Sequence, residues 1–300
     1  MALLVVGSIA FDQIKTPREE LKDVLGGSAV HCALAASHIA PVQLVGVVGK
    51  DFPHEHLRML ANRGVDTAGV DVAEGKTFRW AGEYFGTMNR RETLWVELNV
   101  LENFQPKIPP SFRESQFVFL ANGAPLTQLS VLDQVKKPRF VMADTMDLWI
   151  RTAHQDVLRL LKRIDGLILN DEEAILLTDE PTILGAGEAI LRMGPQRVVI
   201  KKGEHGAILF TPGSVVPLPA FPVRELRDPT GAGDSFAGGL MGYLAKAGNT
   251  EPPTFKAALA YATVVASFCV EDFGTNRLQK AARGEIDERF QRYCSLLRVD

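Results

Sequence analysis

The sequence predicts an α/β fold, a three-layer sandwich in which a mainly parallel central sheet lies between two layers of helices. Short apolar runs alternate along the chain with stretches of helical period, and this order is typical of parallel strands joined by helices. The 300 residues are 46% hydrophobic, which is enough to bury one large core, so we expect a single domain over residues 1–300. In chain order, the patterns predict strands at 3–6, 43–48, 117–120, 140–143, 166–169 and 197–200, and helices at 28–39, 54–63, 151–163, 184–193 and 253–271.

Two segments interrupt this order, about 13–25 and 76–100, because their apolar side chains alternate with the two-residue period of strands. We expect them to form a small β-sheet that projects from the main body, with a turn near 88–91. An edge sheet without a special role is the alternative interpretation. Aromatic side chains exposed on such a sheet favour burial by a substrate or a partner. The alternating residues of the second segment are Phe78, Trp80 and Tyr84 before the turn, and Leu94, Val96 and Leu98 after it.

Composition and charge exclude several functional classes. A net charge of −3 offers no general attraction to nucleic acid or to an anionic membrane, so neither is expected as a partner. The cysteines at 32, 269 and 294 are too few and too widely spaced for a disulfide framework or a zinc site, and they suit a reducing cytoplasm. Residues 1–6 lack a basic segment and are expected to form a strand, not a signal peptide. The longest apolar stretch, 257–270, is too short to span a bilayer and is expected to form a buried helix.

The most informative segment is the run Asp228-Pro-Thr-Gly-Ala-Gly-Asp-Ser-Phe-Ala-Gly-Gly239. Its proline and its glycines at 231 and 233 interrupt regular structure, so a helix is expected to begin near Gly231 to Gly233. The residues on one apolar face of that helix are Phe236, Leu240 and Leu244. A P-loop would need a lysine after the glycines, and a dinucleotide fingerprint would need a third glycine where Phe236 stands.

The start of this helix is a candidate phosphate site. Backbone N–H groups of Gly231, Ala232 and Gly233 would lack intrahelical partners and could hold an anionic phosphoryl group. Asp234, in the first turn, would be kept ionised by the helix dipole and could accept the proton of an attacking hydroxyl group. A capped helix without a ligand is the alternative interpretation.

The same run resembles the C-terminal signature of the PfkB carbohydrate kinase family, which includes ribokinase and adenosine kinase. Four other segments resemble motifs of this family in the family's order, and together they span almost the whole chain. The resemblance implies a ribokinase-like fold in which the small sheet is a lid over the substrate and, in several members, pairs with a second subunit. It also implies ATP and Mg²⁺ as cofactors. The four segments are 26–33, 45–51 with 63–66, 169–173 and 201–206.

The resemblance places the acceptor at four positions of the N-terminal half. Asp12 corresponds to an acidic residue that accepts hydrogen bonds from substrate hydroxyls, although an aspartate at a strand end can also cap a turn. Gly26 and Gly27 would let the substrate approach the backbone, or simply form a tight turn. His31 stands where the family usually has asparagine, so the resemblance does not specify which acceptor binds here. A histidine packed in the core is equally compatible with the position. Asp234 completes the expected acceptor site.

The nucleotide side is expected from two further motifs. Asn170 and Glu173 match the family's motif that organises Mg²⁺ and phosphate oxygens, often through water, and they could equally form a capping box at a helix start. Lys202, Gly203 and Gly206 match its nucleotide-side turn, although Lys202 alone would pass as a solvated surface lysine.

The loop before the phosphate helix is expected to contribute as well. Thr230, together with Gly231 and Gly233, is expected at the ATP site. In relatives, residues near Asp228 and Thr230 surround adenine or hold a monovalent cation, so K⁺ is a further candidate ligand. Gly274 is placed to cap the C-terminal end of the helix at 253–271.

These observations predict an ATP-dependent kinase that transfers the γ-phosphate to a hydroxymethyl group of a sugar. A nucleoside kinase is the alternative, and segment 266–271 resembles archaeal nucleoside kinases. A sensor without catalysis would not need Asp234, so the presence of this residue favours an enzyme. A nicotinamide-dependent dehydrogenase would need a glycine fingerprint after the first strand, and the sequence has none there. Expected partners are the small acceptor, ATP and a second copy of the chain bound through the lid.

Overall fold

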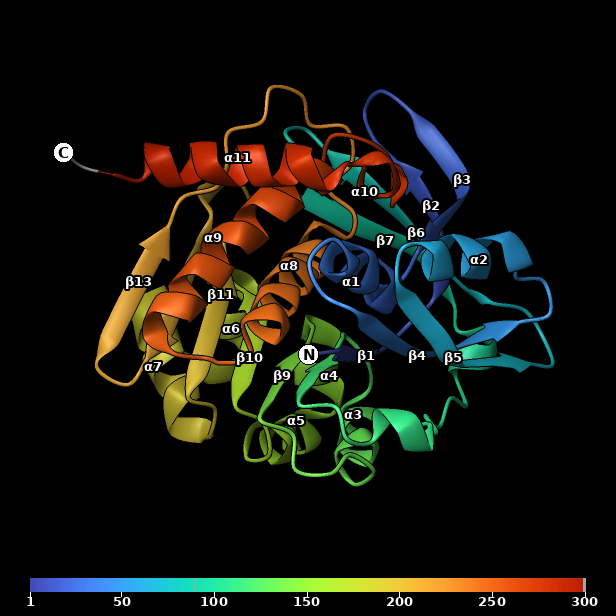
Figure 1. Ribbon diagram of the computed structural model, residues 1–300, viewed down its shortest axis with the longest axis horizontal. Helices are drawn as coiled ribbons and strands as arrows, with labels where there is room; N and C mark the ends of the chain where they lie inside the picture. The colour runs from blue at the N-terminus through green and yellow to red at the C-terminus, as the bar shows by residue number, and fades with distance from the viewer. Residues whose placement is uncertain (89, 299–300) are drawn as a thin grey trace.

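A nine-stranded sheet forms the centre of the molecule within residues 1–88 and 90–298, which the computed structural model describes (Figure 1). The strand order is β13-β12-β11-β10-β9-β8-β1-β4-β5, and all strands from β5 to β11 are parallel, whereas β12 and β13 form an antiparallel edge. The strands are β1 (Leu3–Val6), β4 (Val42–Gly49), β5 (Val65–Ala73), β8 (Phe117–Leu120), β9 (Phe140–Asp144), β10 (Gly166–Asn170), β11 (Arg197–Lys201), β12 (Ala207–Thr211) and β13 (Ser214–Leu218). The mainly parallel sheet predicted from the sequence is confirmed.

Helices cover both faces of this sheet, because successive side chains of each strand point to opposite sides. Leu3 and Val5 of β1 pack with α1, α8 and α9, while Leu4 and Val6 pack with α5, α6 and α7. The first layer contains α1 (Ser28–Ser37), α8 (Ala232–Ala247) and α9 (Pro252–Cys269), with α2 (His54–Asn62), α10 (Asn276–Lys280) and α11 (Arg283–Leu296) at its margins; the second contains α3 (Pro125–Leu132), α4 (Asp147–Thr152), α5 (His154–Leu161), α6 (Asp171–Thr178) and α7 (Ile183–Met193).

Helices α1 and α8 pack so closely that one glycine of the signature run is required. A Cβ atom at Gly238 would overlap the backbone carbonyl of Cys32 in α1. The close contact holds the N-terminal turns of the two helices together, and both turns face the site described below.

A second, separate sheet has the order β3-β2-β6-β7, and we call it the lid sheet. It consists of β2 (Ala10–Lys15), β3 (Glu20–Gly26), β6 (Phe78–Phe85) and β7 (Arg90–Glu97), as the alternating segments predict. Asn89, in the turn expected near 88–91, lies outside the described residues. Two short 3₁₀ turns, Asn99–Leu101 and Pro110–Phe112, lead from the lid sheet back to β8.

Two expectations about helices are wrong. The helix expected at 151–163 is divided into α4 and α5 at Ala153, whose extended φ of −135° ends α4; the break lets Ile150 and Val157 both reach the core. Gly274 does not cap α9, which ends at Cys269 with Val270 as its C-cap. Instead, Gly274 has a φ of 53° and donates its N–H to Oδ2 of Asp228, 2.8 Å away, so it joins two loops. Among the described residues, no helix is long and apolar enough to cross a membrane.

Candidate active site

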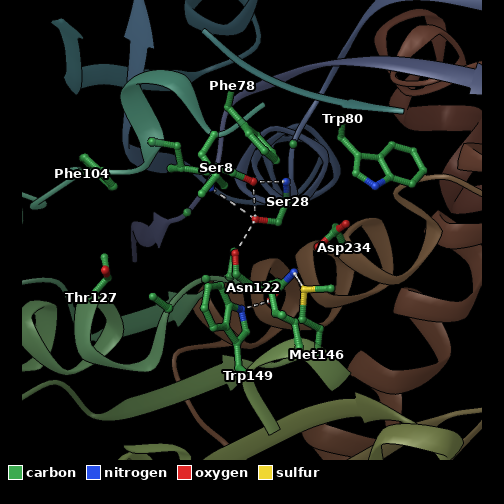
Figure 2. Close-up of a pocket in the computed structure, with 18 of the residues that line it drawn as sticks. Ser8, Ser28, Phe78, Trp80, Phe104, Asn122, Thr127, Met146, Trp149 and Asp234 are labelled. Atoms are coloured by element: carbon green, nitrogen blue, oxygen red, sulfur yellow. Dashed lines mark hydrogen bonds between the residues drawn. The ribbon is translucent and has the colours of Figure 1, made fainter. Parts of the chain in front are cut away.

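A cavity of about 390 Å³ lies beyond the carboxyl ends of β1 and β8, between the first turns of α1 and α8 and the lid sheet. Ligands of parallel α/β sheets bind at this edge. Figure 2 shows side chains from these elements around the cavity, including Asp234 of α8 and Trp80 of the lid sheet. The lining also contains Asp12, Gly27 and His31, so the structure brings the residues predicted for the acceptor together with the predicted base.

Asp12 is a buried carboxylate at the polar end of this cavity. Its side chain is 5% exposed and lies directly against Gly26, where a Cβ atom would overlap the carboxylate. Burial, together with the charges of Asp228 and Asp234, raises the pKa of Asp12 from 3.8 to about 8. At neutral pH the carboxyl group is therefore mostly protonated, and hydroxyl donors of a ligand would stabilise its ionised form, because it has few hydrogen bonds within the protein.

His31 lies under the loop that leads into α8. The side chain is 1% exposed, and a Cβ atom at Gly231 would overlap its ring, which restricts this position to glycine. Burial lowers the pKa of His31 to about 4, so the ring is neutral, and its Nε2 atom has no hydrogen-bond partner among the described residues. The ring therefore packs against the loop before α8 and also lines the cavity.

The first turn of α8 has the geometry expected of an anion site. Gly231 is its N-cap with a φ of 73°, and the carbonyl of Gly231 accepts the N–H of Ser235 at 2.8 Å. The N–H of Ala232 donates to the carbonyl of Pro229 at 3.1 Å. Within the described part of the chain, the N–H of Gly233 has no acceptor, so it is available to donate to an anion. Anion binding by the amides of Gly231, Ala232 and Gly233 stays a prediction.

Asp234 follows these amides and faces the cavity (Figure 2). Burial and the charge of Asp144 raise its pKa to about 7, although Lys201 and Arg91 act in the opposite direction. The expected ionised form is therefore not complete at neutral pH. A carboxylate with this pKa suits proton transfer near pH 7.

Asn170 and Glu173 form the capping box that the sequence allowed. The side chain of Asn170 accepts the N–H of Glu173, and the side chain of Glu173 accepts the N–H of Asn170, both at 2.7 Å. Burial raises the pKa of Glu173 to about 7. One oxygen of each side chain is used in the box, and the second carboxylate oxygen of Glu173 remains for another ligand.

Asp228 connects the loop before α8 with the loop after α9. Its Oδ1 accepts the N–H of Thr230 and its Oδ2 accepts the N–H of Gly274, each at 2.8 Å. The hydroxyl of Thr230 contacts the hydroxyl of Tyr84 in β6 at 3.0 Å, which links this loop to the lid sheet. Binding of a cation by Asp228 and Thr230 stays a prediction.

The turn after β11 lies beside the site but does not line the cavity. The N–H of Lys202 donates to the carbonyl of Gly206 at 2.7 Å and closes the turn. Gly206 has a φ of 94° and Gly203 a φ of 53°. The roles of Lys202, Gly203 and Gly206 in ATP binding stay predictions.

Several residues at the site are missing from the sequence prediction. Lys201 at the end of β11 pairs with Asp144 at the end of β9, with 3.2 Å between Nζ and Oδ2. The two-residue period of β11 could have predicted that Lys201 points inward. Val199 and Lys201 lie on the same face of the strand, and Val199 packs in the core that contains α8. The other residues missed line the apolar end of the cavity or its lid, namely Arg91, Asn122, Met146 and Trp149.

The amide group of Asn122 is one of the polar groups at the apolar end. The indole N–H of Trp149 donates to Oδ1 of Asn122 at 3.2 Å, and Nδ2 of Asn122 lies 3.2 Å from Sδ of Met146 (Figure 2). Sulfur is a weak acceptor, so the amide group of Asn122 retains donor capacity toward the cavity. Phe104 and Phe78 add aromatic surface.

Several known proteins resemble this chain over most of its length. The family model for pfkB family carbohydrate kinases matches residues 2–282. The cytidine kinase of Thermococcus kodakarensis is 30% identical over 252 residues, which cover 80% of this chain and 88% of that protein. The nucleoside kinase of Methanothermobacter thermautotrophicus is 28% identical over 306 residues, which cover 96% and 95%. A structure from E. coli assigned as a ribokinase II, in complex with ATP and Mg²⁺, has a TM-score of 0.81 at 19% identity and covers 97% of this chain and 99% of its own.

The ribokinase-like fold and the kinase class predicted from the sequence are thereby confirmed. The protein is a phosphotransferase that acts on a hydroxyl group of a sugar or a nucleoside. The chain belongs to the pfkB family of carbohydrate kinases.

Proposed function

We propose that this kinase transfers the γ-phosphate of ATP to the primary hydroxyl group of a nucleoside. The observation that carries the proposal is the division of the cavity into a polar end and an apolar end. Asp12, Gly27 and Asp234 form the polar end, which suits the hydroxyls of a sugar ring.

The apolar end suits a planar base. Trp149, Phe104 and Met146 provide flat or polarisable surface, and the amide of Asn122 is placed to donate to a ring carbonyl or nitrogen. A free pentose is polar on all sides and would leave this apolar surface uncovered. The relatives named cytidine kinase and nucleoside kinase support the same acceptor.

In the proposed reaction, Asp12 holds the ring hydroxyls and aligns the primary hydroxyl with the phosphate site. Asp234 accepts the hydroxyl proton as the oxygen attacks the γ-phosphorus, and the N–H of Gly233 donates to the transferring group. The lid sheet covers the acceptor and excludes water, which limits hydrolysis of ATP.

ATP would bind along the turn after β11 and the loop before α8, through Asn170, Lys202, Gly203, Gly206 and Thr230. The carboxylate oxygen of Glu173 that lies outside the capping box fits Mg²⁺, which binds through few protein ligands and keeps part of its water shell, and Asn170 would contact that shell through water. When bound, Mg²⁺ would neutralise charge on the phosphates. K⁺ near Asp228 and Thr230 is part of the same proposal.

The test is a coupled assay of ADP release over a panel of nucleosides, pentoses and hexoses, with and without K⁺, and with product identification by mass spectrometry. We expect the best nucleoside to exceed D-ribose in kcat/KM by at least about a hundredfold, or about 2.7 kcal/mol. The Asp234→Asn variant, which should be inactive, controls for contaminating kinases. A pentose or hexose that equals the best nucleoside would contradict the nucleoside proposal and favour the second candidate, a sugar, which the hydroxyl-binding end around Asp12 would also accept.

The lid sheet supports the expected homodimer. Its edge strand β7 exposes Leu94, Trp95 and Val96 by 47%, 39% and 48%, a large apolar surface for a strand with unpaired backbone groups. Light scattering should show a dimer for the wild type and a monomer for Trp95→Glu; a monomeric wild type would contradict the proposal.

The three cysteines are free, which supports a reducing cytoplasmic location.

A further inference from the structure

Lys201 is a buried cation at the end of the central strands. It is the last residue of β11, where it pairs in register with Asn170 of β10, and Asp144 ends the next strand, β9. The side chain of Lys201 is 19% exposed and that of Asp144 is 5% exposed, so the ion pair between them is largely withdrawn from water. Removing an ammonium group from water is unfavourable, and one carboxylate partner offsets that cost only in part.

The surroundings of Lys201 are more acidic than a structural ion pair requires. Asp144, Glu173 and Asp234 all act on its charge, and they raise its pKa in spite of burial. A triphosphate that approaches this group of carboxylates would be repelled by them. Lys201 is therefore a cation placed to offset that repulsion, and it lies deeper in the protein than Arg91 of the lid sheet, which also acts on Asp234.

The position of Nζ relative to α8 points to a ligand. A Cβ atom built on Gly233 would lie 3.0 Å from Nζ of Lys201, so the ammonium group lies directly beside the first turn of the helix. The N–H of Gly233 has no acceptor among the described residues, and Asp234 is the next residue. An anion held by that N–H would contact the ammonium group as well.

We propose that Nζ of Lys201 binds the transferring phosphoryl group and that Asp144 is a positioning residue that orients it. The proposal rests on the proposed kinase reaction. The acceptor oxygen forms a bond to the γ-phosphorus, the bond from that phosphorus to the β–γ bridging oxygen of ATP breaks, the hydroxyl proton moves to Asp234, and ADP leaves. Lys201 donates to the oxygens of the transferring group while their charge is redistributed.

The first experiment compares Lys201→Met with Lys201→Arg and with Lys246→Met, a control at the exposed far end of α8. With the best acceptor of the panel, Lys201→Met should lose about a thousandfold in kcat, equivalent to about 4 kcal/mol. The KM of the acceptor should change less than threefold, since Lys201 does not line the acceptor cavity. Lys201→Arg should recover at least tenfold of the loss. A folded Lys201→Met variant with kcat within threefold of the wild type would overturn the proposal.

The second experiment measures binding without an acceptor, by calorimetry in the presence of Mg²⁺. Lys201→Met should weaken the ATP analogue AMP-PNP at least tenfold and ADP less than threefold, because only the analogue carries the γ-phosphoryl group. Equal effects on the two nucleotides would overturn the proposed role of Lys201. A wild type that phosphorylated no acceptor would refute only the proposed function, because the binding measurement needs no acceptor. If Lys201→Met does not fold, Asp144→Asn replaces it in both experiments; a purely structural pair predicts a lower Tm with unchanged kcat and unchanged nucleotide selectivity.

Discussion

Replacing Asp12 with asparagine should stabilise the protein at alkaline pH while it weakens acceptor binding. Asp12 is 5% exposed, and its pKa is raised from 3.8 to about 8, chiefly by burial. Between these values the folded protein retains a proton that the unfolded chain has released. The stability of the wild type should therefore fall as the pH rises from about 4 to about 8, and asparagine, which has no such proton, should remove that decline.

The magnitude follows from the two pKa values. Their difference, 8 − 3.8 = 4.2, corresponds to at most about 6 kcal/mol at 1.36 kcal/mol for each pKa unit. About 2 kcal/mol of this penalty is already present at pH 5.5, and about 5.5 kcal/mol is present at pH 8.5. The wild type should thus lose about 3 kcal/mol relative to the variant between these two pH values. Asp234 and Glu173 titrate in the same range, but they do so in both proteins and largely cancel in the comparison.

Urea unfolding at pH 5.5 and pH 8.5 measures this difference, with Asp71→Asn as a control at an exposed aspartate. The same Asp12→Asn variant should raise the KM of the acceptor strongly and leave the KM of ATP nearly unchanged, since Asp12 lies at the acceptor end of the cavity. An unfolding free-energy difference between wild type and variant that is the same at both pH values would refute the reasoning. Equal losses of acceptor and ATP binding would refute the placement of Asp12.

Further variants and a pH profile of the wild type test the site. Asp234→Asn should fold and bind ATP but lose about three orders of magnitude in kcat, because an amide cannot accept the proton; activity within tenfold of wild type would exclude Asp234 as the base. Since the pKa of Asp234 is about 7, the kcat of the wild type at saturating acceptor, where Asp12 is already occupied by the acceptor, should rise between pH 6 and 8 and then level off, whereas a profile that is flat down to pH 5 would mean that another group takes the proton. Gly231→Ala should lower the free energy of unfolding by about 1–3 kcal/mol, because Gly231 has a positive φ and lies against the ring of His31. Adding His31→Ala to this variant should restore part of the lost free energy, and no restoration would contradict the contact between Gly231 and His31. His31→Asn should change the ranking of acceptors by about tenfold, or about 1.4 kcal/mol, with unchanged ATP hydrolysis in the absence of acceptor; an unchanged ranking with only a lower Tm would mean that His31 serves packing alone.

Several parts of the fold and the site are local properties and could be predicted. The start of α8 depends on the glycines and the apolar spacing within one short run, and Asp234 follows that start directly in the chain. The capping box of Asn170 and Glu173 likewise depends on a spacing of three residues. The alternation of β6 and β7 predicts the lid sheet, because the two-residue period is a property of each strand by itself.

Other parts depend on contacts between segments that are distant in the chain, and only the tertiary structure decided them. Lys201 meets Asp144 because β9, β10 and β11 are neighbours in register, so that their carboxyl ends meet at one edge of the sheet. The ring of His31 faces Gly231 because α1 and α8 pack at the distance that Gly238 allows. The sequence by itself determined where helices and strands begin and which functional groups they carry, because both depend on residues that are close together in the chain. The strand order, register and helix packing decided which of these groups meet, and they also set the buried environment that raises the pKa of Asp12 and Asp234.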